Sequence, residues 1–446
     1  MFKRLVKKLS GDGDQSSLKR RAIQGSVWTI IGHGSSQVLR LVGNLILTRL
    51  LFPEAFGLMA LVQTFMTGLE MFSDVGIYPS IIQNKRGDDP AFLNTAWTIQ
   101  VFRGFMLWLC ACLIAWPASQ FFREPMLVQL LPAVGITSFI AGLNSTKMPT
   151  ANRKLQLGRL TALELGSYVL GLVVMIILAW VYKSVWSLVA GGIVSGLTKM
   201  ILSHVFLEGE QNRLHWDRES FKELNRFGRW IFISTVMGFL ASQGDRLVLA
   251  RLLDVRFLGI YTVALTLSLV IQQVVGELSN KVLFASYSEI IRERPERLYP
   301  VLRKNRIILA AIGTAVSLFF VLFGEVLINF LYDDRYVQAG WMLQVLAVGM
   351  VVRPLNLTSG DVLMAKGKAS VIAGLIGTKI LIQFTAMFVG GQLAGPPGVI
   401  IGIAAIDWLM YPIEAVCFAR FGIWQPEVDF PVLALGAGMA AIVYFS

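Results

Sequence analysis

The chain has few charged side chains and very few cysteines and histidines. Only 15% of its 446 residues are charged, whereas 55% are hydrophobic, and there are three cysteines and three histidines. Cys110, Cys112 and Cys417 fall inside apolar segments without the spacing of metal ligands, and His204 and His215 belong to no zinc-binding motif. A disulfide framework and a metal site are therefore not expected, and no cofactor is expected either.

Long apolar runs recur along the whole chain. A soluble protein of this length would need far more polar surface, so the composition indicates a polytopic, all-α membrane protein. Spans of about 20 residues place twelve transmembrane helices near 22–48, 54–82, 91–115, 126–146, 160–182, 185–206, 227–250, 257–283, 305–330, 337–363, 370–391 and 398–419. The apolar tail from Pro431 is short for a full crossing and is predicted as a partial further helix.

The net charge of +12 reflects topology more than nucleic-acid binding. Of the 40 lysines and arginines, 27 lie in the N-terminal tail and the connections on its side, and 6 lie on the other side. The positive-inside bias predicts a cytoplasmic N-terminus. The opposite connections are short, and no loop is large enough for the catalytic domain of a glycan polymerase or ligase. We therefore expect no enzyme activity.

The remaining seven basic residues fall inside the predicted spans. A charge near the bilayer centre costs at least about 2.5 kcal/mol, so such residues normally face a partner or water. Lys281 and Arg246 lie near helix ends and are expected to reach the interface. The others predict a cationic cavity, with structural ion pairs as the alternative: Arg40, Arg103, Lys199, Arg353 and Lys379.

Polar residues also recur at helical spacing within the spans. Each of the first two helices has one polar face, which predicts that these faces meet each other or water. The faces consist of His33, Gln37, Arg40 and Asn44 on the first helix, and Gln63, Thr67, Glu70 and Asp74 on the second. Gln273, Glu277 and Asn280 follow the same pattern on the eighth helix, and Gln100 neighbours Arg103 on the third. Asp407 and Lys379 could pair with each other.

The sequence of one predicted turn occurs twice in the chain. LTRLLFPEAFG (47–57) is followed 202 residues later by LARLLDVRFLG (249–259), and the same offset brings Trp28 onto Trp230. Arg49/Arg251 and Gly57/Gly259 are the informative matches in so apolar a chain. We infer two parallel six-helix lobes around a central cavity. The predicted domains are a basic cytoplasmic tail (1–21), a first lobe (22–206), a cytoplasmic linker on the anionic lipid surface (207–226), a second lobe (227–420) and a C-terminal segment (421–446).

These residues resemble the Wzx-type polysaccharide flippases, in the superfamily that also holds the MATE multidrug exporters and lipid II flippases. The resemblance runs from GSVWTIIGHG through DVGIYPSIIQNK and FFREPMLVQLL to INFLYDDRYVQAGW, and RLLFPEAFG is its most specific part. The second copy of that turn lacks the Pro-Glu pair, and relatives often have fourteen helices.

The resemblance implies a multi-pass flippase of the bacterial inner membrane. It would move an undecaprenyl-pyrophosphate-linked oligosaccharide outward for exopolysaccharide, capsule or O-antigen assembly, with a polymerase and a chain-length regulator as partners. The implied substrate-binding residues are His33, Gln37, Arg40, Asn44, Gln100, Arg103, Lys199 and Arg353, and the implied H⁺ or Na⁺ coupling residues are Glu70, Asp74, Glu277 and Asp407. A MATE-like ion-coupled exporter, a glycan polymerase or ligase, and an assembly scaffold are the alternatives.

Overall fold

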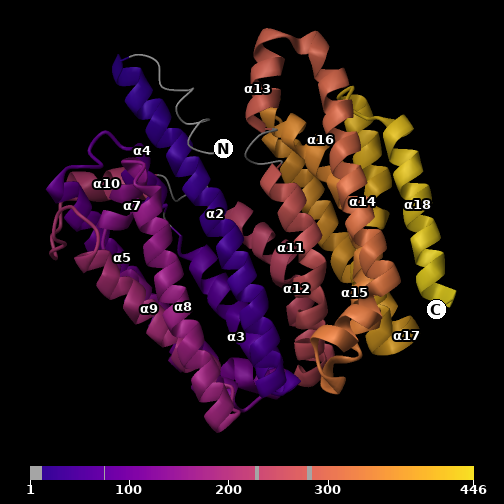
Figure 1. Ribbon diagram of the computed structural model, residues 1–446, viewed down its shortest axis with the longest axis horizontal. Helices are drawn as coiled ribbons and strands as arrows, with labels where there is room; N and C mark the ends of the chain where they lie inside the picture. The colour runs from indigo at the N-terminus through magenta and orange to yellow at the C-terminus, as the bar shows by residue number, and fades with distance from the viewer. Residues whose placement is uncertain (1–12, 75, 227–230, 279–283, 446) are drawn as a thin grey trace, which may run out of the picture. The chain divides into compact units, whose positions relative to one another are not determined.

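The computed structural model describes residues 13–74, 76–226, 231–278 and 284–445, and every regular element in these ranges is a helix (Figure 1). The chain divides into two compact units. Unit 1 comprises Met1–Leu51 and Phe65–Phe232, and unit 2 comprises Phe52–Thr64 and Ile233–Ser446. Helix α3 (Pro53–Phe72) therefore begins in unit 2 and ends in unit 1.

Unit 1 is a bundle of apolar helices that pack through small residues. A Cβ on Gly104 would approach the backbone of Ser138 and Gly142, and one on Gly171 would approach Gly191. Such glycines let helix backbones come close in a membrane. Besides part of α3, the unit contains α2 (Gly13–Leu50), α4 (Ile77–Gln83), α5 (Pro90–Phe122), α6 (Leu127–Gly142), α7 (Lys147–Arg153), α8 (Leu157–Tyr182), α9 (Trp186–Val205) and α10 (Arg218–Arg226).

Unit 2 contains the long helices of the C-terminal half. They are α11 (Ile231–Leu252), α12 (Val255–Leu278), α13 (Phe284–Glu293), α14 (Leu298–Leu331), α15 (Ala339–Met350), α16 (Arg353–Ala365), α17 (Ala369–Arg420) and α18 (Pro426–Phe445), with 3₁₀ turns η2 (Pro295–Arg297) and η3 (Asp334–Tyr336). Helix α17 is two helices joined at a kink, because Ala394 and Gly395 have non-helical dihedrals and Gly395 has φ 62°. Prolines 396 and 397 follow directly and cannot donate the helix hydrogen bonds.

Helices overlie all twelve predicted spans, but several of their limits differ from the prediction. The span predicted at 54–82 ends at Phe72, since Gly76 takes a left-handed conformation with φ 68° and a separate helix, α4, follows. The span at 337–363 is broken before Arg353, where Pro354 occupies the first turn of α16. Helix α14 begins at Leu298, seven residues before the predicted start at 305.

The chain is an all-α membrane protein, although the structure does not confirm a count of twelve spans. Within the described residues, eight helices are long and apolar enough to cross a membrane, or up to nine if α6 and α7 form one bent span. One of the eight is α18, with 20 residues. The prediction of only a partial C-terminal helix was therefore wrong, because the helix begins at Pro426 and includes Glu427 and Asp429.

The repeated turn has the same geometry in both copies. In the first copy, α2 ends at Leu50 and α3 begins at Pro53. In the second copy, α11 ends at Leu252 and α12 begins at Val255, and each of these positions is 202 residues after its equivalent. The positions of Trp28 and Trp230 cannot be compared in the structure, because residue 230 lies outside the described residues.

The two copies of the turn also touch each other within unit 2. A Cβ on Gly57 would overlap the carbonyl oxygen of Val255, and a Cβ on Gly259 would overlap that of Pro53. Each hypothetical Cβ lies 3.0 Å from the backbone nitrogen of the opposite glycine. Glu54 and Arg256, which are equivalent positions in the repeat, face each other with Oε1 and Nε 3.8 Å apart. The glycines are needed because the two helix starts approach backbone to backbone.

The predicted linker at 207–226 is held against unit 1 by hydrogen bonds. Asn212 accepts from the Ser145 hydroxyl at 2.6 Å, and the backbone nitrogens of His215 and Asp217 donate to threonine hydroxyls of α5. Hydrogen bonds from the hydroxyl and amide of Ser220 lower the pKa of Asp217 below its usual value. The part of the predicted linker that precedes α10 is therefore anchored to unit 1.

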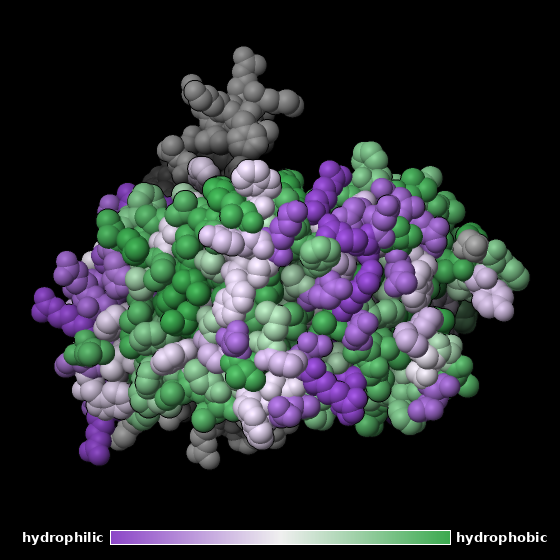
Figure 2. Space-filling model, turned by 90° about the horizontal axis from the view of Figure 1, so that it is seen from below, coloured by the Kyte–Doolittle hydropathy of each residue, from purple (hydrophilic) through white to green (hydrophobic). Residues whose placement is uncertain are grey.

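Hydrophilic residues lie at the helix ends on one face of the molecule (Figure 2). Figure 2 views the ends that lie at the bottom of Figure 1, and hydrophilic residues gather there in patches among hydrophobic ones. Polar side chains at the ends of apolar helices are expected where a chain leaves a membrane.

Candidate functional site

Most of the predicted site residues can be placed, but two cannot. The side chains of His33 and Glu277 lie outside the described part, and so do Gln273 and Asn280. Gln37 and Asn44 are partly buried on α2, and each makes polar contacts.

A cluster of charged and phenolic side chains lies on three helices of unit 1. Lys199 on α9 faces Glu164 on α8, with Nζ and Oε1 3.4 Å apart. Tyr168, one turn after Glu164, interacts electrostatically with Arg40 on α2. We call Arg40, Glu164, Tyr168 and Lys199 the unit 1 polar cluster. Arg40 is exposed, so its guanidinium is available to a ligand.

Tyr78 on α4 extends this cluster. Its hydroxyl accepts a hydrogen bond of 3.2 Å from the Asn152 amide, and it also interacts with the charge of Glu164. Burial raises the pKa of Tyr78, so the phenol stays neutral and keeps its proton to donate. The sequence prediction missed Glu164, Tyr168, Tyr78 and Asn152. Glu164 and Tyr168 could have been predicted from their i, i+4 spacing on an apolar helix, which places them on one face.

Arg103 and Gln100 hold helix ends together. The Arg103 guanidinium donates to the backbone carbonyls of Ser73 and Glu70, each at 2.9 Å, which are among the last carbonyls of α3. The Gln100 amide is within 3.2 Å of the carbonyls of Gly142 and Asn144 after α6. Both side chains thus satisfy backbone groups that lack a helical partner. Substrate binding by these two residues stays a prediction.

Glu70 and Asp74 do not share one helical face, in contrast to the prediction. Helix α3 ends at Phe72, so Asp74 lies in the following turn, where its carboxylate accepts a hydrogen bond of 2.9 Å from the Gly76 amide. Glu70 is exposed and accepts a hydrogen bond of 3.0 Å from Ser138 on α6. Both carboxylates therefore have local partners.

Unit 2 contains the predicted ion pair of Lys379 and Asp407, and Arg353 is a second basic residue beside Asp407. The Lys379 amine donates to one carboxylate oxygen of Asp407, and the Arg353 Nε lies 3.8 Å from the other. Asp407 is buried and both bases are partly buried. Two bases on one acid leave this ion triad with a formal charge of +1.

A second buried ion pair in unit 2 was not predicted. Arg306 on α14 makes two hydrogen bonds of 2.8 Å to the Asp429 carboxylate on α18, and both side chains are fully buried. Ser359 and Tyr411 complete the set of partners. The charge count assigned Arg306 to the connections on the N-terminal side, whereas the residue lies inside α14.

The two charged regions can bind anions and exchange ions or protons. The guanidinium of exposed Arg40 suits phosphate oxygens, and phenol and amide groups suit sugar hydroxyls. Among the described residues, no three His, Cys, Asp or Glu side chains are placed to hold a metal ion.

Several curated proteins are similar to this chain over most of its length. The lipopolysaccharide biosynthesis protein WzxC of Escherichia coli (strain K12) is 22% identical over 392 residues, covering 88% of this chain and 79% of WzxC. The teichuronic acid biosynthesis protein TuaB of Bacillus subtilis (strain 168) is 20% identical over 421 residues, covering 92% and 83%. The succinoglycan biosynthesis transport protein ExoT of Rhizobium meliloti (strain 1021) is 22% identical over 271 residues, covering 60% and 54%.

Solved structures show the same fold. The lipid II flippase MurJ in an inward closed conformation superposes with a TM-score of 0.69 at 12% identity, covering 95% of this chain and 92% of MurJ. An inward-facing MATE family transporter of the MOP superfamily gives 0.64 at 15% identity, covering 90% and 95%. These neighbours are a flippase and a transporter by their titles. The sequence profile of one family, described as "Polysaccharide biosynthesis protein", matches residues 46–340, and this membrane protein belongs to that family.

Proposed function

We propose that the protein is a flippase that moves an undecaprenyl-pyrophosphate-linked oligosaccharide from the inner to the outer leaflet of a bacterial inner membrane. The named relatives serve lipopolysaccharide, teichuronic acid and succinoglycan biosynthesis, and MurJ is a lipid II flippase. Two lobes would alternate access to the substrate, and a polysaccharide polymerase and a chain-length regulator would be the protein partners.

The unit 1 polar cluster is the observation that supports this function best. An exposed arginine in an apolar helix is costly in lipid, so a bound anion or water must compensate it. Arg40 and Lys199 would attract the pyrophosphate through charge-assisted hydrogen bonds, while Tyr78, Tyr168 and Asn152 would contact sugar hydroxyls. His33, Gln37, Asn44, Gln100, Arg103 and Arg353 remain further proposed contacts.

We propose the ion-coupling residues from the positions of their carboxylates. Glu70, Asp74, Glu277 and Asp407 are the candidates for H⁺ or Na⁺ coupling. Asp407 already holds two bases, and a change in either contact would change its affinity for a cation. No cofactor is needed for such a cycle.

Flipping of a fluorescent polyprenyl-pyrophosphate oligosaccharide in proteoliposomes tests the proposal. We expect Arg40→Gln to reduce the initial flipping rate about tenfold or more, since one charge-assisted hydrogen bond is worth roughly 1.5–3 kcal/mol. The matched control is Lys183→Asn at the end of α8, where a positive charge is removed and asparagine tolerates the left-handed backbone with φ 48°.

The control variant should flip at the wild-type rate. If a folded Arg40→Gln protein also flips at the wild-type rate, the unit 1 polar cluster does not bind the substrate. If the wild-type protein transports a cationic dye and no lipid-linked glycan, the MATE-like alternative replaces the flippase.

A further inference from the structure

Two neighbouring polar groups in unit 2 each retain an oxygen without a hydrogen-bond partner. Glu414 on α17 is 8% exposed, and the side chain of Asn356 on the adjacent α16 lies near its carboxyl group. Within the described residues, Glu414 Oε2 and Asn356 Oδ1 are buried and have no donor. Buried oxygens of this kind are rare, because losing water without gaining a partner is unfavourable.

One proton would satisfy both oxygens. An ionised carboxylate has only acceptors, so a charged Glu414 has no donor for Asn356 Oδ1. A protonated carboxyl carries an O–H at Oε2 that can donate to Asn356 Oδ1, and its other oxygen can accept from the Asn356 amide. Acid and amide then exchange two hydrogen bonds.

The charged groups around Glu414 do not neutralise it directly. Asp407, two helical turns earlier on α17, adds a negative charge, and Lys379 and Arg306 contribute positive charges. Both bases already have carboxylate partners, Lys379 in Asp407 and Arg306 in Asp429. Among the described residues no base lies within ion-pair distance of Glu414, and Cys417 is the other titratable neighbour. Burial therefore favours the neutral carboxyl.

We propose that Glu414 is a proton-binding site of unit 2, which carries a proton with Asn356 as its hydrogen-bond partner. The site lies outside the ion triad, since Glu414 contacts neither Arg353 nor Lys379. Proton binding is inferred from the burial of Glu414 and its unpaired oxygen, whereas a role of that proton in ion coupling rests on the proposed flippase function.

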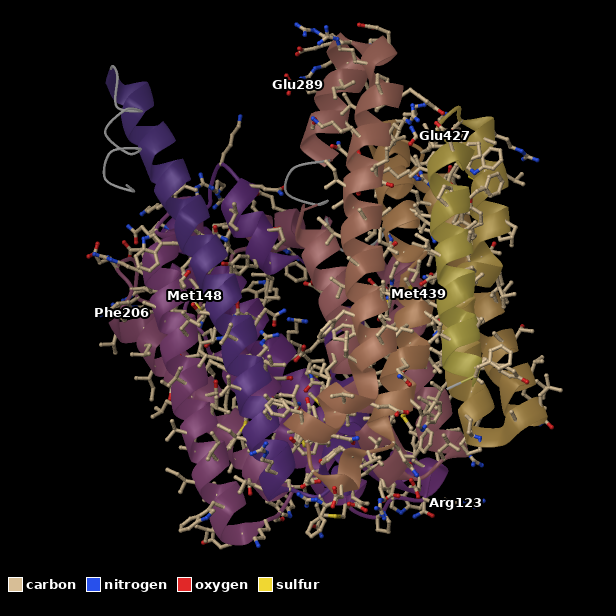
Figure 3. The ribbon with its side chains drawn as sticks, turned by 45° about the vertical axis from the view of Figure 1, so that its right-hand side comes forward. Arg123, Met148, Phe206, Glu289, Glu427 and Met439 are labelled. Atoms are coloured by element: carbon tan, nitrogen blue, oxygen red, sulfur yellow. The ribbon has the colours of Figure 1, made fainter. Side chains whose placement is uncertain are left out.

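Infrared difference spectroscopy of the full chain in lipid nanodiscs tests proton binding directly. We expect a carbonyl band of a protonated carboxylic acid at neutral pH that is lost at alkaline pH. Glu414→Gln should remove this band, and Asn356→Ala should shift its frequency because the hydrogen bond is lost. The matched control Glu289→Gln, on an exposed residue of α13, should leave the band unchanged (Figure 3).

A spectrum without this band at neutral pH would overturn the proposal, as would a band that persists in Glu414→Gln. If Glu414→Gln does not fold, the wild-type titration and the frequency shift in Asn356→Ala decide the question. In proteoliposomes, Glu414→Gln should keep flipping without a pH gradient and lose its stimulation by one. If the wild-type protein does not flip at all, the proposed function fails while the infrared result still decides on Glu414.

Discussion

At the scale of single residues, the pair of Arg306 and Asp429 is fully buried, so removing one partner leaves the other charge without compensation. We expect Asp429→Asn to lower the free energy of unfolding by about 3–5 kcal/mol, because it leaves a buried guanidinium without its counter-charge. Thermal unfolding followed by size-exclusion chromatography measures this loss. Replacing both partners together, Arg306→Met with Asp429→Leu, should recover part of it, since no charge then remains unpaired.

The control for this prediction lies one turn away. Arg303 and Glu427 form an exposed pair with 3.8 Å between Nε and Oε1, and Figure 3 shows Glu427 at the start of α18. Arg303→Gln should cost less than about 1 kcal/mol, since water and salt screen an exposed pair. If Arg303→Gln and Asp429→Asn lower the free energy of unfolding equally, burial does not strengthen the pair of Arg306 and Asp429.

At the scale of elements, the contact between the starts of α3 and α12 depends on two glycines. Gly57→Val and Gly259→Val should each destabilise unit 2 by about 1–3 kcal/mol or more, because the new side chain overlaps a backbone carbonyl rather than a flexible side chain. The midpoint of thermal unfolding is the measurement.

A glycine in an open place provides the comparison. Gly438 on α18 has nothing within 4 Å of a hypothetical Cβ. Gly438→Ala should be neutral or stabilise the helix by up to about 1 kcal/mol, since alanine has the higher helix propensity. If Gly57→Val unfolds at the same temperature as Gly438→Ala, the two helix starts do not need their close contact.

At the scale of the whole molecule, the charge asymmetry predicts which side of the membrane each connection faces. A cysteine at Lys183, between α8 and α9, should react with a membrane-impermeant thiol reagent added outside intact cells. A cysteine at Lys368, before α17, should react only after the membrane is permeabilised. The wild-type chain is the control, because Cys110, Cys112 and Cys417 are partly buried and should not react.

The reverse labelling pattern would contradict the predicted orientation. It would place the N-terminal side, with its excess of lysine and arginine, outside the cell.

The sequence by itself determined the class of the protein, its helices and its repeat. These follow from local properties, namely apolar runs of membrane length and a recurring turn. The limits of the helices were less predictable, since the end of α3 and the break before α16 depend on backbone turns that apolar composition does not reveal.

Only the tertiary structure decided what the charged residues contact. Arg103 donates hydrogen bonds to carbonyls at a helix end, and Arg306 donates to a carboxylate 123 positions later. Glu414 lies near an amide side chain on another helix. A charge in an apolar run indicates that a partner must exist, because its solvation cost has to be offset. Which partner it is depends on which helix faces pack together, and that follows from the shapes of many side chains at once.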